Sequence, residues 1–210
     1  LAKTITACLA FLAVTNKQAL SCTSIVLAAN DGGRVYGRTM EFGVLLHSQA
    51  LEMPRGYAHV GIGPDGTPGK GRNWTSKYAV IGANVFGKPI FVDGLNEVGL
   101  AGGLLNAVNT AVYQKVPAGK EADSIAPQQL LTYVLTNFAT VDEVRAALSN
   151  IYVNSAIMKE WGGTPKAHMT LHDAKGGSIV VEYLDGKLVI TDNLIGVLTN
   201  DPAFSWHLSN

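Results

Sequence analysis

The chain has 210 residues, of which 47% are hydrophobic and only 15% charged, and its 16 basic residues balance 16 acidic ones. This length suits one domain with a sizeable core, and the low charge with 23 glycines indicates a globular, strand-rich chain. Zero net charge without a Lys/Arg cluster argues against a nucleic-acid partner, because phosphate neutralisation needs concentrated positive charge. Two cysteines exclude a disulfide scaffold and a cysteine-rich zinc site.

Residues 1–21 have the pattern of a signal peptide. They contain two lysines and no acid, and their apolar stretch, 5–14, is shorter than the roughly 20 residues that span a bilayer, so we expect no stable membrane insertion. The small-x-small triplet Ala19-Leu20-Ser21 fits a signal peptidase site. We therefore expect an exported protein, periplasmic or secreted. The alternative is an amphipathic N-terminal helix that packs on the domain.

Cleavage after Ser21 would make Cys22 the first residue of the mature protein and would remove Cys8, the other cysteine. An N-terminal cysteine carries its own base, since an α-amino group titrates near ~7.7–8.0. The amine can take the thiol proton and later return it to a leaving group, so no histidine partner is needed. The alternatives are a buried structural cysteine and a lipidated N-terminus, although the residues before Cys22 make a poor lipobox.

The pattern that follows is mainly strand. Strands are expected at residues 22–29, 34–38, 49–53, 77–83, 89–92 and 100–105. Turn residues at 30–33 join the first two into a hairpin, which places Arg38 near Cys22, where a cation would favour the thiolate. Residues 61–76 are a loop rich in Gly and Pro. They contain a GxGxxG match, but no helix follows it, so it is not a dinucleotide site.

Two helices and a second group of strands complete the pattern. Ser124 is expected to cap the first helix, and Thr140 with Glu143 forms a capping box for the second, at 141–148. The first helix presents one apolar face, made by Leu131, Val134, Leu135 and Phe138. Strands are then expected at 167–173, 178–184, 188–191 and 195–199. Strands, then helices, then strands predict one α+β domain over residues 22–210.

His168 and His172 have the spacing of a helical zinc site, but they fall on an expected strand. Four strand residues separate them by roughly 13 Å, which is too far to share one ion. We interpret them as ordinary strand side chains. The sequence thus predicts no metal and no cofactor.

Several motifs in order resemble the choloylglycine hydrolase family, which includes bile salt hydrolases and penicillin V acylases among the N-terminal nucleophile hydrolases. These motifs are CTS at 22–24, YGRTME at 36–41, PRGY at 54–57, DGLNEVGLA at 93–101, LLN at 104–106, SIVVE at 178–182 and VLTNDPAFSWHL at 197–208. The resemblance spans residues 22–210. It implies a four-layer αββα sandwich and a hydrolase that cleaves linear amide C–N bonds through a thioester.

The resemblance also assigns the site residues. Cys22 matches the nucleophile, and Arg38 matches the arginine beside the thiol. Glu41 stands where many members have Asp, which binds the N-terminal amine. Asn106 would stabilise the oxyanion, and Asn200 would orient the amine and the substrate amide. Family members extend further and carry another active-site arginine there, so we expect this sequence to be a C-terminally incomplete fragment.

The expected substrate is a small amide with a bulky apolar acyl group, as in a conjugated bile salt or penicillin V, and acyl-homoserine lactones are a third class. Met40, Phe42, Leu45 and Leu46 either line its pocket or simply pack in the core. The resemblance suggests a homotetramer. Two alternatives without catalysis remain: an envelope protein lipidated at Cys22, and an inert paralogue that binds amphipathic ligands.

Overall fold

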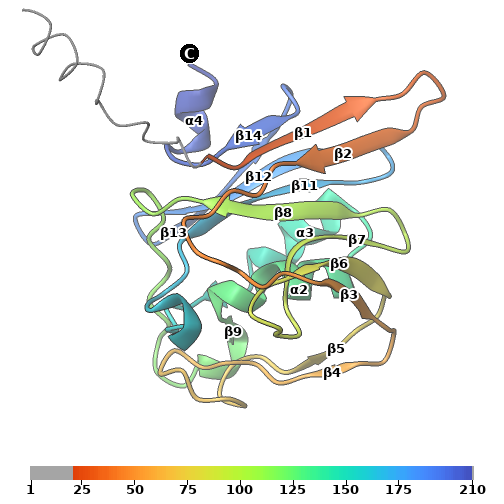
Figure 1. The fold of residues 1–210 in the computed structure, drawn as a ribbon. Coiled ribbons are helices and arrows are strands. Elements are labelled where there is room, and N and C mark those ends of the chain that lie inside the picture. The colour runs from red at the N-terminus through yellow and green to blue at the C-terminus, as the bar shows by residue number, and fades with distance from the viewer. Residues whose placement is uncertain (1–20, 210) are drawn as a thin grey trace, which may run out of the picture.

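The computed structural model describes residues 21–209. Almost all of the expected signal peptide, with Cys8, lies outside the described residues. Two antiparallel sheets and a pair of helices form layers (Figure 1). The large sheet runs in the order β13-β12-β11-β8-β7-β6-β3 and the small one in the order β14-β1-β2.

The large sheet consists of β3 (Ala50–Met53), β6 (Val80–Asn84), β7 (Phe91–Asn96), β8 (Ala101–Asn106), β11 (Ala167–His172), β12 (Ser178–Leu184) and β13 (Lys187–Asp192). The small sheet consists of β1 (Thr23–Ala28), β2 (Arg34–Arg38) and β14 (Val197–Thr199). Two short pairs are β4 (Ala58–His59) with β5 (Trp74–Thr75), and β9 (Ser124–Ile125) with β10 (Tyr152–Val153). The helices are α2 (Pro127–Asn137), α3 (Val141–Leu148) and α4 (Phe204–His207), with 3-10 turns at Glu121–Asp123 and Lys159–Trp161.

Strand periodicity divides the apolar residues of the large sheet between its two faces. On β12, Ile179 and Val181 join the main core under helices α2 and α3, whereas Val180 points the other way. Val180 packs there with Leu105 of β8, with Leu198 of the small sheet and with Cys22. This second core holds the two sheets together and buries the cysteine between them.

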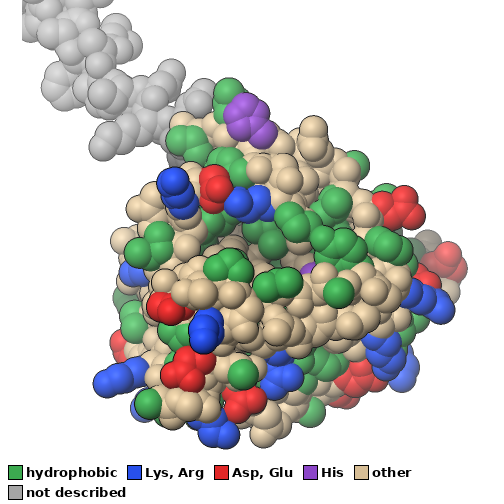
Figure 2. All heavy atoms as spheres, turned by 90° about the horizontal axis from the view of Figure 1, so that it is seen from below, with side chains coloured by type: hydrophobic (Ala, Val, Ile, Leu, Met, Phe, Trp, Pro, Cys, Tyr) green, Lys and Arg blue, Asp and Glu red, His purple; other side chains and the backbone are tan. Residues whose placement is uncertain are grey.

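Most expected elements are confirmed, and the β1–β2 hairpin pairs in the register Ser24 to Arg38. The expected strand at 89–92 was misplaced, since β7 covers Phe91–Asn96. The α+β class is also confirmed. Within residues 21–209, no helix is both long and apolar enough to cross a membrane. On the face seen in Figure 2, basic and acidic side chains are interspersed.

The expected cap of the first helix was wrong. Ser124 lies in β9, and its hydroxyl donates to the Glu121 carbonyl at 2.7 Å. Helix α2 begins instead with Pro127 at its first turn, where the missing N–H costs no hydrogen bond. The Thr140 cap of α3 is confirmed, because its hydroxyl accepts from the Glu143 N–H at 3.3 Å. The Glu143 carboxylate accepts from the Ala139 N–H at 2.8 Å, one residue before the one that the capping box predicts.

Candidate active site

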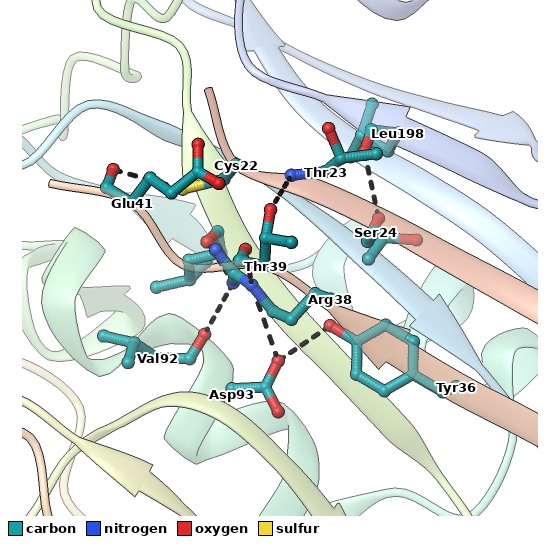
Figure 3. A network of polar contacts seen from close by, with 12 residues as sticks. Cys22, Thr23, Ser24, Tyr36, Arg38, Thr39, Glu41, Val92, Asp93 and Leu198 are labelled. Carbon is teal, nitrogen blue, oxygen red and sulfur yellow. Dashed lines mark hydrogen bonds and ion pairs between the residues drawn. The ribbon is translucent and has the colours of Figure 1, made fainter. Parts of the chain in front are cut away.

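Cys22 lies immediately before β1, at the junction of the two sheets. Its side chain is fully buried and is a free thiol, and Sγ donates to the Glu41 carbonyl oxygen at 3.7 Å (Figure 3). The small sheet fixes this position from both sides. Thr23 pairs with Thr199 of β14, and the Thr39 N–H donates to the Thr23 carbonyl oxygen at 2.9 Å.

Arg38 ends β2, and only 5% of its side chain is exposed. Its Nη1 donates to the carbonyl oxygens of Leu104 at 2.6 Å and Val92 at 3.4 Å, and its Nε donates to Thr39 O at 3.1 Å. Nη2 is buried, and it has no hydrogen-bond partner among the described residues. Backbone carbonyl groups therefore hold the guanidinium in place, and Nη2 can still donate a hydrogen bond.

A carboxylate and a phenol complete the surroundings of Arg38. Asp93 Oδ2 lies 3.9 Å from Arg38 Nε and accepts a hydrogen bond from Tyr36 Oη at 2.8 Å (Figure 3). Burial raises the pKa of Asp93, although the Tyr36 hydrogen bond and the Arg38 charge both oppose this shift. Burial, then the charge of Asp93, raise the pKa of Tyr36. Tyr36 therefore stays protonated and acts as the donor.

Gly103 of β8 makes room for this cluster. A Cβ atom there would lie 2.4 Å from Tyr36 Oη, 2.8 Å from Asp93 Oδ2 and 2.9 Å from Arg38 Nη1. Contacts this short are far below van der Waals distance. The three side chains can converge only because the facing strand has no side chain at this point.

Glu41 is exposed and lies close to the start of the domain. Its Oε2 accepts from the backbone N–H of Ser21 at 3.1 Å, while its own carbonyl oxygen faces the thiol of Cys22. The carboxylate thus contacts the residue directly before Cys22. The longer Glu side chain reaches the region where the amine of a processed N-terminus would lie.

Asn106 and Asn200 meet where two strands end. Asn200 Oδ1 accepts from the Asn106 N–H at 3.0 Å, and the Asp201 N–H donates back to the Asn106 carbonyl oxygen at 2.8 Å. Thr199, the residue before Asn200, donates from Oγ1 to the Cys22 carbonyl oxygen at 2.8 Å. One short segment therefore connects both asparagines to the cysteine.

An apolar cavity opens beside Asn106. Its wall contains Met40, Phe42 and Leu46, as expected from the sequence, but Leu45 is 81% exposed and is not part of it. The other wall residues are Val85, Ile90, Val92, Leu104, Leu105, Gln128, Met158, Trp161, Pro165, Lys166 and Ala167. Trp161 packs edge-on against Phe42, with ring centroids 5.4 Å apart.

The structure thus brings the expected residues Cys22, Glu41, Asn106 and Asn200 together, with Arg38 on the adjoining strand. Sequence reasoning missed Asp93, Thr199 and Trp161. The first two fall inside motifs at 93–101 and 197–208, which is a usable signal, but residue type alone does not show which side chain they contact. Trp161 ends the 3-10 turn Lys159–Trp161, in a segment with no strand or helix periodicity, so the sequence did not indicate its place in the wall.

Comparison with known proteins agrees with this geometry. A family model described as linear amide C–N hydrolases, choloylglycine hydrolase family, matches residues 22–210. The bile salt hydrolase/transferase of Clostridium perfringens is 35% identical over 191 residues, which cover 90% of this chain and 56% of that protein. The penicillin V acylase of Pectobacterium atrosepticum is 34% identical over 145 residues, which cover 65% of this chain and 38% of that protein.

Solved structures give the same result. A variant of the conjugated bile acid hydrolase from Clostridium perfringens superposes with a TM-score of 0.77 at 34% identity, covering 90% of this chain and 56% of the other. Penicillin V acylase from Agrobacterium tumefaciens gives 0.73 at 31% identity, with 90% and 55% coverage. The expected sandwich of N-terminal nucleophile hydrolase type is confirmed. The chain spans little more than half the length of these relatives.

Proposed function

Because the chain belongs to the choloylglycine hydrolase family, we propose that the mature protein hydrolyses the C–N bond of a linear amide with Cys22 as its nucleophile. One observation carries the proposal: Cys22 is a fully buried free thiol directly before β1. Thr199 binds the Cys22 carbonyl oxygen, and the next residue, Asn200, binds Asn106. Removal of residues 1–21 during export would turn the nitrogen of Cys22 into a free amine.

The reaction has two steps. The α-amine takes the thiol proton as Sγ attacks the amide carbonyl, and the oxyanion of the tetrahedral adduct is stabilised by Asn106. Collapse of the adduct breaks the C–N bond, and the protonated α-amine gives its proton to the departing amine. Water, activated by the same amine, then attacks the thioester and releases the carboxylic acid and the thiol.

The remaining residues prepare Cys22 for this cycle. Glu41 would bind the α-ammonium group, since its carboxylate already accepts from the neighbouring Ser21 N–H. Arg38 supplies a fixed positive charge on the adjoining strand, and Asn200 orients the amine and the substrate amide. Backbone contacts hold Arg38 in place, so little reorganisation is needed during the reaction.

The apolar cavity beside Asn106 supports a substrate with a bulky apolar acyl group. Met40, Phe42 and Trp161 give the wall both adaptable and aromatic surface, which suits an apolar acyl group. A conjugated bile salt and penicillin V are therefore the two substrates to compare. Relatives named for each of them match this chain.

The test uses the full-length protein after export. Its N-terminus is sequenced, and hydrolysis of penicillin V, of a glycine-conjugated bile salt and of an acyl-homoserine lactone is measured for the wild type and for Cys22→Ser. Ser24→Ala, which changes a buried residue on β1, is the control for folding. We expect a start at Cys22 and at least one cleaved amide, with a rate that falls by about 10³ or more in Cys22→Ser only.

Two results would contradict the proposal. If the mature chain starts elsewhere, or carries a diacylglyceryl group on Cys22, the α-amine is not available as the base and the lipid-anchored alternative is favoured. If Cys22 is free and no amide of the three classes is cleaved, the alternative of an inert protein that binds amphipathic ligands is favoured.

A further inference from the structure

A buried histidine and glutamate contact each other in the large sheet, beside the segment that carries Asn200. His168 on β11 and Glu182 on β12 are each 2% exposed, and their atoms Nδ1 and Oε1 are 3.3 Å apart. Neither residue has a part in the proposed reaction. We propose that this pair is a positioning device that holds Asn200 and Cys22 in their reactive arrangement, an inference that rests on the proposed function.

The contacts of the pair fix where its protons lie. His168 Nε2 is 2.8 Å from the Thr199 carbonyl oxygen, which can only accept, so Nε2 carries a proton and donates it. Nδ1 faces the Glu182 carboxyl oxygen, and two acceptors cannot bond without a proton between them. The same oxygen, Oε1, also accepts from the Phe204 N–H at 2.9 Å. The histidine and the glutamate therefore act as one hydrogen-bonded unit.

The two partners hold opposite ends of a single segment. His168 binds the carbonyl group of Thr199, and Glu182 binds the N–H of Phe204, so residues 199–204 are fixed at both ends. Asn200 lies inside this segment and binds the Asn106 N–H. Thr199 also donates from Oγ1 to the Cys22 carbonyl oxygen. Any shift of the segment would move an asparagine and the nucleophile together.

The neighbouring histidine of β11 gives an internal comparison. His172 is also buried, at 3% exposure, and lies on the same strand four residues later. Its ring nitrogens contact the hydroxyl groups of Thr170 and Ser178, which belong to β11 and β12. These hydrogen bonds stay within the large sheet, and the ring also packs against Tyr36 of β2, with centroids 5.3 Å apart. The Tyr36 hydroxyl is held separately by Asp93, and none of these contacts involves residues 199–204. Substitution of His172 should therefore disturb the same strand without displacing residues 199–204.

Glutamine at position 182 cannot reproduce the contacts of the carboxylate. Phe204 and His168 both contact Oε1 of Glu182. An amide oxygen at this position would carry no negative charge, so its bond to His168 would be weaker. An amide nitrogen there would leave the Phe204 N–H without an acceptor. Glu182→Gln has nearly the same shape as the wild type, so it weakens the hold on the segment with little change in packing.

The experiment compares His168→Gln, Glu182→Gln and the double variant with the matched control His172→Gln, all in the full-length exported protein. Penicillin V or bile salt hydrolysis gives kcat and KM. The rate at which iodoacetamide alkylates Cys22 gives a second measure that needs no turnover. Thermal unfolding of each variant gives its loss of stability, so that variants of equal stability are compared.

We expect both single variants at positions 168 and 182 to lower kcat about tenfold or more while KM changes less than threefold, and to change the alkylation rate of Cys22. The double variant should lose little more than either single one, since the pair acts as a unit. His172→Gln should keep kcat and the alkylation rate. Equal kcat in all variants, or equal losses at positions 168 and 172, would overturn the inference.

Failure of the proposed function gives a different result. If the wild type cleaves no amide, the proposed function is wrong, and this is known before any variant is compared. The alkylation rates still test the pair in that case. If they are the same in Glu182→Gln, in His172→Gln and in the wild type, the positioning inference is wrong as well.

Discussion

Asn200 Oδ1 accepts the backbone N–H of Asn106 at 3.0 Å, and this bond joins the end of β14 to the end of β8. The two asparagines are 94 residues apart in the chain, yet they meet next to Thr199, which donates to the Cys22 carbonyl oxygen. Asn200 uses its side-chain oxygen to hold the backbone of Asn106, and Asn106 is one of the residues that line the apolar cavity. The two residues therefore have different tasks.

Asn106→Ala should abolish most of the activity. Loss of a side-chain donor to the oxyanion costs roughly 10²–10³ in kcat, so a fall of this size with a modest change in KM is expected. Steady-state hydrolysis by the purified variant measures it. Asn150→Ala is the matched control, because Asn150 is exposed and its side chain donates to the nearby Ala146 carbonyl oxygen at 3.1 Å. A fall of less than threefold would remove Asn106 from the oxyanion site.

Gly103→Ala should displace Arg38. The new methyl group would overlap Tyr36 Oη, Asp93 Oδ2 and Arg38 Nη1, so the guanidinium must move away from its backbone acceptors. We expect at least a tenfold loss of kcat. Gly37→Ala is the control. Gly37 precedes Arg38 in β2, and nothing lies within 4 Å of a Cβ at that position. Equal activities of the two variants would show that the cluster does not support catalysis.

Trp161→Ala should weaken substrate binding rather than chemistry. The indole lines the cavity and packs against Phe42, so its removal is expected to raise KM about tenfold or more, which is ~1.4 kcal/mol or more of binding free energy. Leu45→Ala is the control, since Leu45 is exposed and lies outside the cavity wall. A KM that rises as much in the control would place the acyl group elsewhere.

Acid should destabilise the fold through two buried histidines. Burial lowers the pKa of His172 and of His59 to about 4, from an ordinary value of 6.5. Between these values the unfolded chain binds protons that the folded chain does not, so the free energy of unfolding falls as the pH falls through this window. For His172 the slope is at most about 1.4 kcal/mol per pH unit.

Urea unfolding at a series of pH values between about 7 and 5 measures this slope. In His172→Gln the free energy of unfolding should depend less on pH, because glutamine does not bind a proton in this range. An unchanged slope in that variant would show that His172 does not titrate as its burial implies.

The sequence predicted much of the fold because its strands alternate and its turns carry strong local signals. The Asn30–Gly33 turn and the Thr140 cap are set by residues a few positions apart, and both formed where expected. The cap at Ser124 failed because a local pattern competed with a tertiary one: this serine is drawn into pairing with β10. The order of strands in the two sheets depends on distant pairings that no local signal contains.

For the site, the motifs predicted residues but not their contacts. Asn106 and Asn200 were expected to act together, and the structure shows which atom of each makes the bond. His168 was interpreted as an ordinary strand residue, because on a strand it lies too far from His172 to share a metal ion with it. Its importance depends on Thr199 and Glu182 lying beside it, and folding alone brings them there.

The most direct test of the central proposal is to trap the acyl-enzyme. The mature protein is mixed with a cleaved substrate, quenched in acid within one turnover, and examined by intact and peptide mass spectrometry. We predict a mass increase equal to one acyl group, on the peptide whose first residue is Cys22, and none after prior alkylation of the thiol. Turnover without such an adduct, or an adduct on another residue, would contradict the account.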